Sequence, residues 1–191
     1  MLRLIVVALA LTCAVIGGAA AGHGAWIGVK AQAAQYLIER AWQRSERREA
    51  RDSNLQPWPW ADTQVLARLR VPSAAQEQFV LAGAHGQALA FGPGHLSGTP
   101  LPGEFGNSVI AGHRDTHFEF LRDIGVGDEI FFDLPDGRTV RYRVRRVWVT
   151  TEDDLRPLAE QAATALTLIT CYPFDALRAG GPLRYIVEAQ A

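Results

Sequence analysis

The run Thr167-Leu168-Ile169-Thr170-Cys171 decides how this chain is organised. It is apolar and β-branched, which favours a short buried strand, and it ends on a thiol. The Tyr172-Pro173-Phe174 tract that follows ends the strand, because proline has no N–H for a ladder hydrogen bond. Cys171 is therefore predicted to stand at the end of a rigid strand, beside an irregular loop. A thiol in such a place is a nucleophile when a nearby group removes its proton.

Short runs with period-two alternation lie on both sides of this strand. Strands are predicted at 65–71, 78–82, 108–113, 129–133, 139–150, 165–171 and 183–189, and helical segments at 85–91, 118–124 and 151–163. Asp136-Gly137 is a strong turn signal that predicts a hairpin between the fourth and fifth of these strands. In the predicted strand 139–150, the alternation of buried and exposed residues continues through Arg145-Arg146 or shifts there, depending on whether the pair forms a β-bulge. Seven or eight short strands with few helices predict an all-β barrel with minor helices.

The N-terminus is strongly apolar. Residues 4–29 include no Asp, Glu, Lys or Arg, and a run of about 20 apolar residues spans a bilayer as a helix. In one interpretation, residues 1–25 are a retained signal anchor and transmembrane segment. In the other, Ala19-Ala20-Ala21 is a cleavage site and the segment is a signal peptide that is removed. The length of the run and an interfacial Trp26 favour the anchor, and both interpretations export the rest of the chain.

Residues 26–56 are predicted to form a helical stalk and linker. Apolar residues recur there at spacings of three and four, and the charges of both signs in 39–52 are typical of a solvated helix face. The tract Pro57-Trp58-Pro59-Trp60 ends the helix, because proline disfavours helix at the residue before it. The globular domain is therefore predicted over residues 57–191.

Composition narrows the function classes. The chain has 191 residues, is 48% hydrophobic and has a formal net charge of -1, which suits one globular domain with an appendage and gives no reason to expect a nucleic-acid partner. Cys13 lies in the apolar N-terminus, so Cys171 is the only thiol of the predicted globular part. This removes a disulfide and any multi-cysteine metal site, and no cofactor is predicted.

His113 and Arg184 are the candidates to assist Cys171. His113 ends an apolar strand directly after Gly112, and imidazole suits both the removal of a proton and its return to a leaving amine. Arg184 lies on the strand after the thiol and offers several fixed donors to a developing oxyanion. His113 and His117 are four residues apart, but no H-E-x-x-H pattern accompanies them, so no metal site is predicted. Each residue taken alone is more often structural than catalytic.

The combination resembles one family. The run Thr167–Cys171 resembles the T-L-x-T-C signature of sortases, which are membrane-anchored cysteine transpeptidases. Ala111-Gly112-His113-Arg114 resembles their G-H-R segment, and Gly181-Pro182-Leu183-Arg184-Tyr185 falls where the family has its catalytic arginine. The order His, Cys, Arg agrees as well, and the similarity covers residues 65–189. The Pro-Trp-Pro-Trp tract and the run Gly112–Phe118 look most like the sortases of Gram-negative bacteria.

The resemblance implies a closed eight-stranded sortase-type barrel, preceded by the transmembrane helix and the stalk. It implies catalysis by His113, Cys171 and Arg184, with Thr170 in the substrate-binding groove. Cys171 would cleave the LPxTG-like C-terminal sorting signal of a secreted protein through a thioester, and an amine, such as one of peptidoglycan, would accept the acyl group. It further implies a single-pass protein of the cell inner membrane with a periplasmic catalytic domain. Some sortases bind calcium, but the acidic loop residues (Glu104, Glu152, Asp153, Asp154) match no dedicated calcium loop.

Two alternatives stay open. An L,D-transpeptidase-like cell-wall enzyme would have an arginine close behind its cysteine, whereas Arg184 follows Cys171 by thirteen residues. A non-catalytic, anchored β-barrel binding module would use the same three residues structurally. A papain-like protease is excluded, because its cysteine precedes its histidine in the chain.

Overall fold

The computed structural model describes residues 2–46, 55–178 and 180–191, and for much of the chain before residue 29 it describes the backbone alone. The helical elements are α1 (Leu2–Glu46), η1 (Pro72–Ala74), α2 (Gly86–Phe91), η2 (Glu119–Asp123) and η3 (Arg156–Leu158). The strands are β1 (Val65–Val71), β2 (Gln76–Ala82), β3 (Gly94–His95), β4 (Gly106–Ala111), β5 (Glu129–Asp133), β6 (Thr139–Thr151), β7 (Thr164–Tyr172) and β8 (Leu183–Gln190). The chain divides into two units, Met1–Leu37 and Ile38–Ala191, and the strands all belong to the second.

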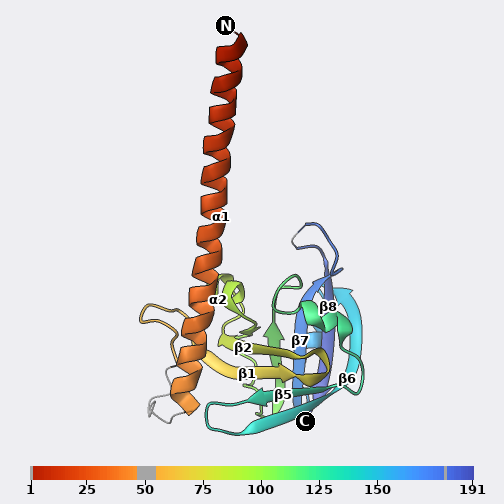
Figure 1. Ribbon diagram of the computed structural model, residues 1–191. Coiled ribbons are helices and arrows are strands. Elements are labelled where there is room, and N and C mark those ends of the chain that lie inside the picture. Colours follow the sequence, from red (N-terminus) through yellow and green to blue (C-terminus); the bar gives the residue numbers. More distant parts are fainter. Residues whose placement is uncertain (1, 47–54, 179) are drawn as a thin grey trace. The chain divides into compact units, whose positions relative to one another are not determined.

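The strands close into a barrel in the order β1-β2-β3-β4-β7-β8-β6-β5 (Figure 1). Neighbouring strands are antiparallel except β2 with β3 and β4 with β7, which are parallel. The predicted all-β class and closed eight-stranded barrel are therefore confirmed. Because β4 and β7 run in the same direction, their carboxyl ends meet at one edge of the barrel. That edge carries both Gly112-His113 and Cys171.

Alternation of side chains explains why these segments form strands. In β1, Val65, Leu69 and the other odd-numbered residues are buried, and the residues between them are partly exposed. In β6 the alternation shifts by one residue, because a bulge lies between Val144 and Arg146 where β6 pairs with β8. Val144 and Val147 consequently both pack against the core. The arginine pair thus marks a break in the alternation.

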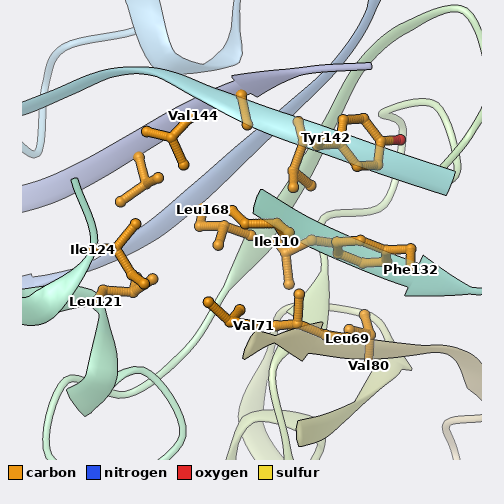
Figure 2. Close-up of a cluster of buried hydrophobic side chains, with 14 of the residues drawn as sticks. Leu69, Val71, Val80, Ile110, Leu121, Ile124, Phe132, Tyr142, Val144 and Leu168 are labelled. Carbon is orange, nitrogen blue, oxygen red and sulfur yellow. The ribbon is translucent and has the colours of Figure 1, made fainter. Parts of the chain in front are cut away.

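One apolar cluster fills the barrel (Figure 2). Leu69, Ile110 and Leu168 meet there from β1, β4 and β7. Tyr142 is fully buried, and its hydroxyl accepts a hydrogen bond from the Gly103 amide at 2.7 Å. Burial raises the pKa of this phenol. Fully burying one large apolar side chain stabilises the fold by about 1.5–3 kcal/mol. Ile110 and Leu168 are both fully buried, so β4, which leads to His113, and β7, which carries Cys171, are held firmly by the core.

The end of α1 belongs to the globular unit. Ile38, Ala41 and Trp42 are buried in a second cluster with Val65 and Leu81. Their spacing of three and four places them on one face of the helix. The compact unit therefore begins at Ile38, whereas the sequence prediction began the domain at residue 57. α1 ends at Glu46, before the prolines that were predicted to end it, and its last residues already pack against β1 and β2.

The predicted membrane segment is not confirmed. Across the part of the chain that the structure describes, no helix has the combination of length and apolar character that crossing a bilayer requires. α1 is one helix from Leu2 to Glu46. Most side chains of the predicted segment 1–25, and residues 47–54 of the predicted stalk and linker, lie outside the described residues.

The connection 151–163 was predicted to be helix-compatible, and this prediction is wrong for most of its length. Only η3 forms within it, and Pro157 lies inside that short helix. The side-chain amide of Asn107 donates to the carbonyl oxygens of Pro157 at 2.9 Å and Ala159 at 3.1 Å. These carbonyls are thus bound by β4 instead of by a following helical turn. The result is an irregular loop held against the outside of the barrel.

Asp133 connects β1 to the β5–β6 hairpin. Its carboxylate accepts hydrogen bonds from Arg70 Nε at 2.6 Å and Nη2 at 2.8 Å, from Arg68 Nε at 3.1 Å and from Thr139 Oγ1 at 2.7 Å. The hydrogen bonds of Arg70 are the main reason that the pKa of Asp133 falls to about 2. Because ionisation of this group is favoured by folding, its contribution to stability is present above about pH 4 and is lost as the pH falls towards 2.

We expect Asp133→Asn to lower the free energy of unfolding by about 1–2 kcal/mol at pH 7, because two arginines lose a shared, largely buried carboxylate. The difference from the unsubstituted chain should shrink between pH 4 and pH 2, where Asp133 itself becomes protonated. Urea unfolding at pH 7 and pH 3 measures both effects. Asp153→Asn, at an exposed loop position, is the matched control. An Asp133→Asn deficit of the same size at both pH values would contradict the expectation.

Candidate active site

The register of three adjacent strands lines up three side chains at one end of the barrel. β7 and β8 pair Cys171 directly with Arg184. The parallel pairing of β4 with β7 runs to the last residue of β4, opposite Ile169, and the Gly112 amide still donates to the Ile169 carbonyl at 3.1 Å. His113 comes two residues after Ala111, the last residue of β4, and Cys171 comes two residues after Ile169, so both lie at the same edge of the barrel. The three predicted site residues, His113 after β4, Cys171 in β7 and Arg184 in β8, are called the row below.

This row lies on the outer surface of the barrel. Leu166 and Leu168 point into the core from β7, so Cys171 shares the opposite face with Ile169. The thiol of Cys171 is half-buried and His113 is exposed. The thiol is thus accessible from outside, while the strand behind it is fixed by the core.

Phe118 and Thr170 fix the segment that carries His113. The Phe118 amide donates to the His113 carbonyl at 2.9 Å. Phe118 is also why residue 112 is glycine, because a Cβ at Gly112 would lie 2.7 Å from the Phe118 ring. The Thr170 hydroxyl donates to the Gly112 carbonyl at 2.7 Å.

Thr170 was predicted to lie in the substrate-binding groove, and its side chain is buried. It is only 2% exposed, because its position in β7 faces away from the row. Its hydroxyl instead ties β7 to the residue before His113. Thr170 therefore fixes the spacing between the thiol strand and the histidine segment.

Arg184 is held by its own loop and by one carboxylate. Its Nη1 donates to the carbonyl oxygens of Gly181 at 2.6 Å and Leu183 at 2.9 Å, and its Nη2 donates to Glu152 Oε2 at 2.8 Å. A guanidinium has five N–H donors, so two remain beyond these contacts for a substrate carbonyl. Glu152, which was considered from the sequence only as a calcium ligand, thus orients the arginine. No local pattern could have identified the pair, because the two residues are 32 positions apart.

A pocket of 120 Å³ opens beside Arg184 and Ile169 on the same face. Its apolar lining is Leu155, Pro157, Leu158, Ile169 and Ile186, and its other lining residues are Thr150, Thr151, Glu152, Asp154 and Arg184. Asp154 is bound by Arg156 at 2.8–3.0 Å and by the Thr150 hydroxyl. The hydrogen bonds of Arg156 are the main reason that the pKa of Asp154 is lowered. The pocket therefore has an apolar lining, referred to below as its floor. Its charged residues are already paired, Glu152 with Arg184 and Asp154 with Arg156.

His117 lies outside the row. Its Nδ1 is 3.3 Å from Gln78 Oε1, and burial is the main cause that lowers its pKa. Within the described ranges, no three His, Cys, Asp or Glu side chains gather as metal ligands. Of the acids considered for calcium, Glu104 accepts a hydrogen bond from the Leu101 amide at 2.8 Å.

Comparison with known proteins gives one consistent family. The model of the sortase domain matches residues 69–191. Sortase D of Bacillus subtilis (strain 168) is 31% identical over 125 residues, which are 65% of this chain and 62% of that protein's length. The chain thus covers less than two thirds of this relative. Among solved structures, sortase A of Corynebacterium diphtheriae matches with a TM-score of 0.62 and 26% identity, over 82% of this chain and 83% of that one. The Clostridium perfringens sortase D5 transpeptidase has a TM-score of 0.62 over 82% and 94%, and at 23% identity it supports the fold alone.

Proposed function

This chain belongs to the sortase family, and from that premise we propose that it is a membrane-anchored cysteine transpeptidase that acts on a secreted protein with an LPxTG-like sorting signal. The observation that supports this proposal most strongly is the direct pairing of Cys171 with Arg184, at the barrel edge where β4 ends two residues before His113. A thiol, an acid–base group and a cation are the groups that acyl transfer from one peptide carbonyl requires.

The first half-reaction forms a thioester. The Cys171 thiol gives its proton to His113, and the sulfur attacks the threonine carbonyl of the sorting signal. The resulting oxyanion is stabilised by the donors of Arg184 that its other contacts leave available. The carbon–nitrogen bond then breaks, and His113 gives a proton to the departing amine. The acyl part of the substrate stays on Cys171 and the C-terminal tail leaves.

The second half-reaction transfers the acyl group. An amine attacks the thioester while His113 accepts its proton, a new amide forms, and the Cys171 thiolate leaves. The same imidazole therefore serves as acid and then as base. Peptidoglycan is the proposed source of the amine.

The pocket beside Arg184 suits the part of the signal that precedes the cleaved bond. Its apolar floor matches an aliphatic side chain such as the leucine of the signal, because its charged members are already paired with one another. Ile169 connects this floor to the thiol, since it lies two residues before Cys171 on the same face of β7.

The location and the subclass are part of the proposal. The charge-free run over residues 4–29 supports single-pass anchoring in the cell inner membrane, with the catalytic unit on the periplasmic side. The Pro57-Trp58-Pro59-Trp60 tract and the segment that follows Gly112 support the Gram-negative class of sortases.

We expect the full chain, in detergent, to join a fluorescent LPxTG-like peptide to a peptidoglycan stem peptide that carries a free amine. Mass spectrometry should find the joined product and an acyl adduct at Cys171, and the adduct should decay much faster when the amine is present. A peptide of scrambled sequence is the control. An adduct that decays equally fast without amine would contradict transfer. A folded chain that forms no adduct with any LPxTG-like peptide would contradict the substrate class.

A further inference from the structure

One buried charged side chain lies next to the row and has no part in the chemistry proposed above. Arg114 follows His113 directly and is 5% exposed. Its Nη1 donates to the Gly180 carbonyl at 3.0 Å, and its Nη2 donates to the carbonyls of Ala176, at 3.3 Å, and Arg178. All three acceptors belong to the β7–β8 loop, which is defined as residues 173–182.

A guanidinium can leave water only when other acceptors replace the water around it. Here the acceptors are main-chain carbonyls at every second residue, so the loop bends around the cation. Gly180 has a φ of +80°, in the left-handed region that glycine adopts without strain. A planar group with five donors suits several carbonyls at once better than a single ammonium does.

The β7–β8 loop depends on this contact, because its own packing is slight. Most of its described residues are exposed, and Leu177 is fully exposed. The main apolar contacts between the loop and the barrel are made by Phe174, whose ring contacts Tyr172 and Tyr185. Phe174 lies at the start of the loop. At the end of the loop, Arg184 binds the Gly181 carbonyl and the Glu152 amide binds the Pro182 carbonyl. Between these two ends, Arg114 binds the carbonyls of Ala176, Arg178 and Gly180.

The loop begins two residues after Cys171 and ends two residues before Arg184. We propose that Arg114 is a positioning residue, which locks the β7–β8 loop to the histidine segment and so keeps all three members of the row in one arrangement. This inference rests on the proposed function for its effect on catalysis, but the locking itself does not. Because the loop begins two residues after Cys171, holding it in place is expected to limit the access of water to a thioester.

Trypsin provides a direct test, because it cleaves after arginine and Arg178 lies in the loop with its carbonyl bound to Arg114. We expect Arg114→Gln in the full chain to speed cleavage after Arg178 by about tenfold or more, since cleavage follows the population of the open loop. Hydrogen exchange should quicken at the amides of 173–182 and stay unchanged in β4 and β7. Arg114→Lys should restore part of the protection. Arg138→Gln, at an exposed arginine of the hairpin turn, is the matched control and should change neither measurement.

In the peptide transfer assay, we expect Arg114→Gln to lower kcat/KM and to raise the ratio of hydrolysis to transfer several-fold, with partial rescue by lysine. A loop that stays protected in Arg114→Gln would overturn the inference. So would a loss of protection spread evenly over the whole barrel, which would indicate a purely structural role. If the unsubstituted chain transfers no peptide, the proposed function fails, and the proteolysis and exchange measurements still decide whether Arg114 locks the loop.

Discussion

Replacing Cys171 with alanine is expected to abolish peptide transfer, with a loss of at least about 1,000-fold, because no other group of the row can form the acyl intermediate. The substitution removes one sulfur atom from a half-buried position on the outer face of β7. The fold should therefore survive. Transfer rate, the acyl adduct by mass spectrometry and the temperature of unfolding together measure the effect.

Cys13→Ala is the matched control for this experiment, since Cys13 is the second thiol of the chain and lies in α1. It should leave both the rate and the adduct unchanged. A chain with Cys171→Ala that still joins peptide to amine would contradict nucleophilic catalysis. A binding module would instead retain its ligand in both variants and show no turnover in either, so the same pair of variants tests that alternative.

Replacing His113 with glutamine should lower kcat/KM by about 10²–10⁴-fold, the usual effect of losing a general acid–base group. The loss should be much smaller for a substrate whose scissile amide is replaced by an activated ester, because that leaving group needs no proton from His113. Comparing the two substrates in both enzymes measures the role directly. Equal losses on amide and ester would contradict proton donation to the leaving group.

His117→Gln is the control for His113, because it removes a second imidazole four residues away that lies outside the row. We expect its effect on transfer to be slight. If the two histidines formed a metal pair, both substitutions would be equally damaging, and added chelator would mimic them.

Most of the strands could be predicted because each leaves a local signal. β1 begins and ends where its alternation does, and the hairpin closes at Asp136-Gly137, where the Leu134 carbonyl accepts from the Gly137 amide at 3.0 Å. β3 has only two residues, which is too short for a periodic pattern. The loop of η3 was misread as helix-compatible, because its conformation is set by Asn107 on a distant strand.

The contact made by Thr170 could not be predicted from the sequence either, although Thr170 belongs to a recognised motif. The run from Thr167 to Cys171 identified the thiol, but not which way its neighbour faces. Alternation along β7 puts Thr170 on the inner side, and only the parallel partner strand supplies the Gly112 carbonyl that its hydroxyl binds. Glu152 and Arg114 were missed for a related reason, since each acts on residues far away in the chain.

The sequence by itself determined the chemical groups available to this protein and the short strands that carry them, because side-chain identity and alternation are local properties. Only the tertiary structure decided which groups meet. The antiparallel pairing of β7 with β8 sets Cys171 opposite Arg184, and the parallel pairing of β4 with β7 brings the end of β4, two residues before His113, to the same edge. Strand order and register are set by how the whole apolar surface closes into one core, and no single segment contains that information.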